Sequence, residues 1–79
     1  MSNDNELLRW RKDSKKIDPA LWGKLAALVG TSPGYLNLYA YGVRTPSPRR
    51  ASAIEEATKQ IEGVIPVRKE SLLFYLGDN

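Results

Sequence analysis

A capping side chain followed directly by proline occurs three times in this sequence, at Asp18-Pro19, Ser32-Pro33 and Ser47-Pro48. The side-chain oxygen of a capping residue accepts a hydrogen bond from a free backbone amide, and proline fits the first position of a helix. Each pair therefore predicts the start of a helix. Glycines that follow the apolar segments predict where these helices end. Together the two signals divide the chain into short helices.

These signals predict an all-α fold of about five short helices. The expected helices cover about 4–13, 19–29, 33–41, 48–60 and 67–76; Asn3 or Asp4 caps the first, a polar connection spans 14–17, and Gly30, Gly42 and Gly63 end the middle three. Apolar residues with helical spacing predict the buried faces. They are Leu7, Leu8 and Trp10 in the first helix, Leu21, Leu25, Leu28 and Val29 in the second, and Ile54, Ala57 and Ile61 in the fourth.

The segment after Gly63 has two interpretations. The apolar sequence SLLFYL is typical of a short helix, whereas the β-branched residues of EGVIPVR favour a strand. Residues 64–76 are also a candidate dimerisation element. Their apolar side chains, Leu72, Leu73, Phe74 and Leu76, exceed what one short helix can bury against a thin core.

The stretch LAALVGTSPGYLNLYAYG, residues 25–42, predicts a helix-turn-helix motif over 19–41. Ala26 is small enough for two helices to approach closely, and Gly30 has the backbone freedom that the turn requires. Leu36 and Tyr39 are expected to face the core together with Trp22, while the outer face of the second helix stays exposed. That face comprises Pro33, Gly34, Asn37, Leu38 and Tyr41.

The composition bounds the chemistry of this 79-residue chain, which has the size of one domain, 1–79. It contains no Cys and no His, so disulfides, zinc–thiolate sites, haem ligation and nucleophile–histidine catalysis are excluded. The carboxylates form no convergent pair. We therefore expect neither an enzyme nor a bound metal or cofactor. No apolar stretch approaches the roughly 20 residues that span a bilayer, and MSNDNE does not resemble a targeting signal, so a cytoplasmic location is expected.

The positive charge is concentrated in one part of the chain. The net charge is +3, but residues 7–50 carry nine cations against two acids, a net of +7, and both flanking segments are acidic. Such a distribution indicates a polyanionic partner for the first part of the chain. A solvated basic surface is the alternative.

A family resemblance narrows these interpretations. From Leu7 to about Leu72 the chain resembles the small phage-type Cro regulators, most closely their YdaS-like branch. The resemblance is carried by DPALWGKLAALVGTSPGYL, by the G-x-R-x-P element of Gly42, Arg44 and Pro46, by AIEEAT at 53–58 and by VIPVRKESL at 64–72. It implies a λ-repressor/Cro-like helix-turn-helix domain in a phage or prophage regulator that binds double-stranded DNA.

In that case the second helix of the motif enters the major groove. Asn37 is a candidate for a bidentate contact with adenine, and Leu38 for packing on a thymine methyl. This face has no charge, although the family often has basic or polar residues at the positions of Asn37 and Leu38, so phosphate contacts are expected from its flanks. The candidates are Ser32, Tyr35, Arg44, Arg49, Arg50 and Lys24, with Lys15 and Lys16 as weaker ones. The alternative function is an antitoxin-like or inhibitor module that binds a protein.

Overall fold

Five helices follow one another along the part of the chain that the structure, a computed structural model, describes: residues 6–74, with side chains through Leu72. They are α1 (Glu6–Ile17), α2 (Leu21–Val29), α3 (Pro33–Ala40), α4 (Pro48–Gln60) and α5 (Lys69–Phe74). No strand occurs between residues 6 and 74, so the predicted all-α class is confirmed.

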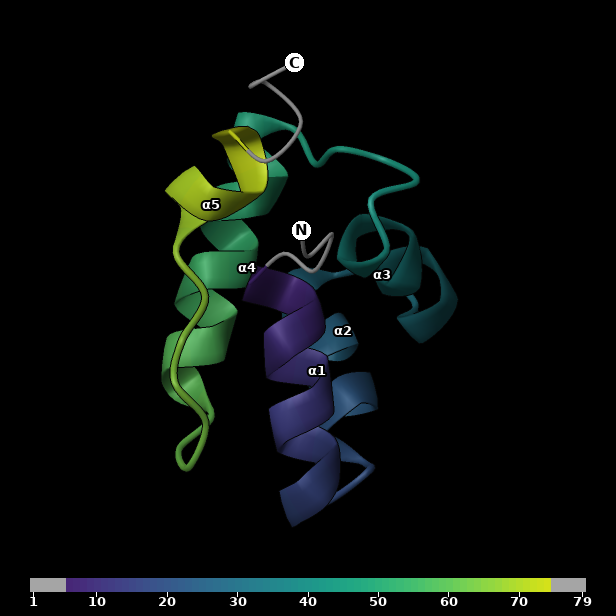
Figure 1. The fold of residues 1–79 in the computed structure, drawn as a ribbon, viewed down its shortest axis with the longest axis vertical. Helices are drawn as coiled ribbons and strands as arrows, with labels where there is room; N and C mark the ends of the chain where they lie inside the picture. Colours follow the sequence, from purple (N-terminus) through teal and green to yellow (C-terminus); the bar gives the residue numbers. More distant parts are fainter. Residues whose placement is uncertain (1–5, 75–79) are drawn as a thin grey trace, which may run out of the picture.

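The helices enclose one small apolar core. In Figure 1, α4 and α3 lie on opposite sides of the molecule, α1 runs between them, and α2 lies behind α1. The helix α1 packs against α2, α3 and α5, and α4 packs against α2 and α5. All five helices and the segment before α5 contribute to the core. Its most enclosed members include Leu7, Trp10, Leu25, Ala26, Leu36, Ala40, Ile54, Val67 and Leu72.

The first helix is longer than predicted. It continues through 14–17, which the sequence indicated as a polar connection. Ser14 is 1% exposed, and its hydroxyl donates to the carbonyl of Arg11 at 3.1 Å, so its polar group is satisfied inside the helix. Lys15 and Lys16 lie in the last turn, where cations interact favourably with the helix dipole. The cap at Asn3 or Asp4 lies outside the described residues.

The second helix starts later than predicted, at Leu21. The carboxylate of Asp18 accepts from the amide of Ala20 at 3.0 Å and closes a turn, so the helix begins without a side-chain cap. The predicted buried face was wrong at Leu28, which is 44% exposed, whereas Trp22 is buried as predicted and its ring packs against Trp10 of α1. Leu25 is buried as predicted.

The fourth helix has the predicted bounds and face. The Ser47 hydroxyl accepts from the amide of Arg50 at 3.2 Å, and Pro48 occupies the first helical position. Ile54, Ala57 and Ile61 are all at most 4% exposed, which confirms the prediction. The chain then reverses at a glycine and runs back along α4 toward α5 (Figure 1).

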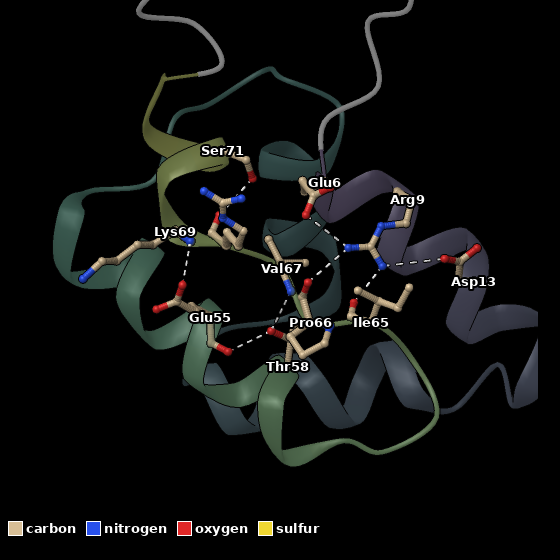
Figure 2. A network of polar contacts seen from close by, with 11 residues as sticks. Glu6, Arg9, Asp13, Glu55, Thr58, Ile65, Pro66, Val67, Lys69 and Ser71 are labelled. Atoms are coloured by element: carbon tan, nitrogen blue, oxygen red, sulfur yellow. Dashed lines mark hydrogen bonds and ion pairs between the residues drawn. The ribbon is translucent and has the colours of Figure 1, made fainter.

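The helical interpretation of the last segment is confirmed, and the strand interpretation was wrong. The helix α5 begins at Lys69, two residues later than predicted, and its predicted end at Leu76 lies outside the described residues. The amide of Val67 donates instead to the hydroxyl of Thr58 at 3.1 Å, and Arg9 donates to the carbonyls of Ile65 and Pro66 at 2.7 and 3.2 Å (Figure 2). Side chains of α1 and α4 thus make the hydrogen bonds to the backbone amide and carbonyl groups that a neighbouring strand would make in a sheet.

The candidate dimerisation element is described only in part. Leu72 is 2% exposed and belongs to the core of this chain. The side chains of Leu73, Phe74 and Leu76 lie outside the described part of the structure.

Candidate nucleic-acid interface

The turn between α2 and α3 is held by backbone hydrogen bonds. Gly30 has φ of 91°, a left-handed conformation that glycine adopts without strain, and its amide donates to the carbonyl of Ala26 at 2.9 Å. The amide of Thr31 donates to the same carbonyl at 2.9 Å. The Ser32 hydroxyl accepts from the amide of Tyr35 at 3.1 Å and caps α3. Ala26 is 1% exposed, as its predicted role in close helix packing requires.

The helix α3 presents one face to the core and the other outward. Leu36 and Tyr39 are buried, as predicted, and Tyr35 is 42% exposed. On the opposite face Pro33 and Gly34 are exposed, Asn37 and Leu38 are half-buried, and Tyr41 just beyond the helix is 56% exposed. The five residues predicted to contact bases therefore all reach the surface to some degree.

Gly34 stands out on this face. A Cβ atom built on it meets no other atom within 4 Å, so no packing within the described protein requires glycine there. Glycine in a helix destabilises it by about 0.5–1 kcal/mol relative to alanine. The residue leaves open space at the start of α3, where a partner can approach the backbone closely.

Asn37 is oriented by a neighbour. The indole Nε1 of Trp22 donates to the Oδ1 of Asn37 at 2.9 Å. The Arg11 guanidinium lies over the rings of Trp22 and Tyr41, at 5.6 and 5.8 Å from their centroids, and its Nη1 donates to the Tyr41 hydroxyl at 3.3 Å. These contacts connect α1 and α2 to the outer face of α3.

The sequence did not predict the role of Arg11. It was one of nine cations in the basic part of the chain, with no feature that distinguished it. Trp22 could have indicated this role. A buried indole N–H needs a hydrogen-bond acceptor, and the face of an indole ring attracts a cation such as Arg11.

Arg44 and Arg50, two of the predicted phosphate-binding residues, lie near Tyr39 on α3. Burial and the neighbouring Tyr35 raise the pKa of Tyr39 above its ordinary value of 10.0, while the positive charges of Arg50 and Arg44 act on it in the opposite direction. Both guanidinium groups therefore lie within electrostatic reach of the hydroxyl of Tyr39. The rings of Tyr35 and Tyr39 meet edge to face, with centroids 5.4 Å apart.

The start of α4 lies against the turn of the motif. The Arg50 Nη1 donates to the carbonyl of Val29 at 3.5 Å. An open hollow of about 340 Å³ is bordered on one side by Val29 and Gly30 and on the other by the first turn of α4; its lining is completed by Ser47, Arg49, Arg50 and Ala53. Arg49 is exposed at this hollow. Two arginines and the capped start of α4 thus border one concave surface.

The remaining cations are placed differently. Lys24 is exposed on α2, and no described contact brings it together with Arg44 or Arg50. Four cations of α1, two of them the weaker candidates from the sequence, border a separate hollow of about 400 Å³. They are Arg11, Lys12, Lys15 and Lys16.

Several acidic side chains of the described residues have partners away from Arg44, Arg49 and Arg50. Glu6 and Asp13 pair with Arg9 at 3.2 and 3.6 Å, and the carboxylate of Glu55 accepts from the amide of Lys69 (Figure 2). Within residues 6–74, no carboxylate pairs with Arg44, Arg49 or Arg50. Their charge is therefore not neutralised by the described part of the protein.

Other kinds of site find no support within the described residues. No group of three or more carboxylates, histidines or cysteines lies close enough to hold a metal ion. None of the five helices combines the length and the apolar character needed to cross a membrane. Comparison with protein-family models, with curated proteins and with solved structures finds no match to this chain.

Proposed function

We propose that this protein binds double-stranded DNA through the outer face of α3 and acts as a Cro-like transcriptional repressor of phage or prophage origin. The observation that carries the proposal is the arrangement of α3, which is capped, held by a fixed turn and flanked by arginines that no described carboxylate neutralises. A helix presented in this way fits the major groove of B-DNA.

The uncharged face and the charged flanks have separate tasks. Asn37, Leu38 and Tyr41 contact base edges, and Pro33 and Gly34 allow the start of α3 to approach the DNA closely. Phosphates on either side of the groove bind Arg44, Arg49 and Arg50, and the Ser32, Tyr35 and Lys24 side chains add contacts. The hollow between the turn and α4 suits a phosphate because the Arg49 and Arg50 side chains both line it and arginine binds phosphate through charge-assisted hydrogen bonds.

The protein binds as a homodimer on a pseudo-palindromic site. One recognition helix reads only a few base pairs, and two helices roughly 34 Å apart on one side of the duplex would double the contacts. The interface comes from residues 64–76, through side chains other than Val64, Val67 and Leu72, which the core of this chain already buries. The protein acts in the cytoplasm of a bacterial host.

Selection of bound sequences from a pool of random duplexes tests this function. We expect enrichment of a motif with two related half-sites, and loss of enrichment when Arg44, Arg49 and Arg50 are all replaced by alanine. A pool that remains random after several rounds, with a folded protein, would contradict the proposal.

A second function, binding of a protein partner, is favoured by one observation. Three exposed apolar side chains, Tyr35, Tyr41 and Val43, lie on or just beyond α3, and Val43 is 69% exposed. An antitoxin-like or inhibitor module would use them to contact a protein. Such a module would show weak duplex binding even at low salt, whereas phosphate contacts give strong binding that falls steeply with salt.

A further inference from the structure

The amide of Asn37 is asymmetric in its surroundings. Its Oδ1 accepts from the indole Nε1 of Trp22 at 2.9 Å, and Trp22 is only 9% exposed, so the oxygen is directed toward the interior. Within residues 6–72, the buried side-chain polar atoms without a partner are Trp10 Nε1 and Arg11 Nε. The Nδ2 of Asn37 has no partner among these residues either, and it is not one of the buried atoms, so this part of the protein leaves it accessible to solvent.

The donor of this hydrogen bond is itself held in place. The Arg11 guanidinium covers one part of the Trp22 ring at 5.6 Å, and the Trp10 ring packs at 6.2 Å with an interplanar angle of 38°. The indole therefore cannot turn away from Asn37 without losing both contacts. The amide keeps its oxygen inward and its nitrogen outward.

We propose that Trp22 sets the base preference of Asn37, so that Asn37 reads guanine and not adenine. This inference rests on the proposed DNA-binding function. An asparagine pairs with adenine when its oxygen accepts from N6 and its nitrogen donates to N7. Here the oxygen faces the interior and already accepts a hydrogen bond, so an approaching base edge meets only the two N–H donors.

Guanine matches two donors better than the other bases. Its major-groove edge presents two adjacent acceptors, O6 and N7, whereas adenine offers one acceptor beside a donor, and thymine offers one acceptor beside a methyl group. Cytosine presents a donor, which opposes the amide. The expected order at the contacted position is guanine first, adenine and thymine next, and cytosine last.

Two substitutions change this pattern in different directions. Asn37→Asp keeps an oxygen that accepts from Trp22 but replaces the outward donors by an acceptor, so preference should move to cytosine, whose N4 donates. Trp22→Phe removes the indole N–H while keeping an aromatic ring under Arg11. The oxygen of Asn37 is then free to turn outward, and adenine should become acceptable.

Sequence selection from random duplexes, carried out with the full chain, these two variants and Asn37→Ala, tests the inference. Asn37→Ala identifies the contacted position, because it alone should lose preference there. At that position we expect guanine to be favoured about tenfold in the unmodified protein, cytosine in Asn37→Asp, and adenine to rise to the level of guanine in Trp22→Phe.

A spectroscopic readout separates positioning from loss of structure. The indole proton of Trp22 should stay at the downfield NMR shift of a hydrogen-bonded proton, or move further downfield, in Asn37→Asp and should move upfield in Asn37→Ala, and circular dichroism should show that each variant is folded. Should Trp22→Phe not fold, Asn37→Asp alone decides. Adenine preference in the unmodified protein, or an unchanged preference in Asn37→Asp, would overturn the inference while leaving DNA binding intact. Selection of no duplex sequence at all would overturn the proposed function and this inference with it.

Discussion

Replacement of Gly34 by alanine separates the needs of the fold from those of the proposed interface. Gly34 is the second residue of α3, is exposed, and has open space where a Cβ would lie. Gly23 in α2 is a matched control, because it is also helical, exposed and without an atom within 4 Å of a built Cβ. Gly23 does not belong to the outer face of α3.

Both substitutions should stabilise the protein. Alanine lowers the conformational entropy of the unfolded chain and meets no obstacle in the fold, which is worth about 0.5–1 kcal/mol. For a domain of this size, that free energy corresponds to a rise in Tm of about 2–8 °C. Gly34 lies in the first turn of its helix, so its effect should be near the lower end of this range.

Only Gly34→Ala should weaken duplex binding, because the added methyl group holds α3 away from the groove. We expect at least a tenfold rise in Kd, about 1.4 kcal/mol, measured by fluorescence anisotropy on a selected duplex, with thermal unfolding followed by circular dichroism. If Gly34→Ala binds as tightly as the unmodified protein, Gly34 does not contact DNA. If Gly23→Ala weakens binding equally, the loss does not arise from the α3 face.

Three further substitutions test other parts of the account. Arg44→Ala should weaken binding to all duplexes alike and reduce the magnitude of the salt slope by about one, while Lys59→Ala at the far end of α4 leaves the slope unchanged; a changed base preference would show that Arg44 reads bases. Because burial first, and Tyr35 next, raise the pKa of Tyr39 in the folded state, its contribution to stability is complete below pH 10.0 and is lost as the pH rises through the raised pKa. The free energy of unfolding of Tyr39→Phe, measured with a chemical denaturant, should therefore fall less at alkaline pH than that of the unmodified protein. Identical pH profiles of the two proteins would contradict a raised pKa of Tyr39. Sedimentation at micromolar concentration should show a dimer that Phe74→Asp dissociates, whereas a full-length monomer that binds one half-site tightly would end the dimer proposal.

Local signals in the sequence predicted much of the fold. Ser32 and Ser47 cap the helices that follow them, and Gly30 takes the left-handed conformation of the turn, because each role depends on neighbouring backbone atoms. Asp18 does not cap α2 in this way, because its carboxylate accepts from the amide of Ala20, before the helix begins. Short-range hydrogen bonding therefore fixed most starts and ends.

Features that depend on packing between helices were not predictable. Ser14 belongs to α1 and is 1% exposed, and Leu28 is 44% exposed although its spacing placed it on the buried face of α2. The hydrogen bond from Trp22 to Asn37 joins residues fifteen apart in sequence. It depends on how α2 and α3 pack against each other. Periodicity places Asn37 on the outer face but contains no information about how its amide is turned.

For the arginines, too, the position in sequence was predictable and the packing was not. Arg44, Arg49 and Arg50 follow the motif in sequence, so a position on its flank was predictable. The hollow that Arg49 and Arg50 share with the turn depends on how α4 packs against α2. That packing brings Arg50 to the carbonyl of Val29, a contact that no sequence pattern indicates.

The salt dependence of duplex binding tests the central claim most directly. The affinity for a labelled duplex is measured at several salt concentrations, from about 50 to 200 mM, with the unmodified protein and with Arg44, Arg49 and Arg50 all replaced by alanine. The three arginine contacts together contribute about −2.7 per protomer to the slope of log K against log salt, and the triple variant should lose this contribution. An affinity that does not change with salt, or a folded triple variant with the original slope, would contradict DNA binding through this surface.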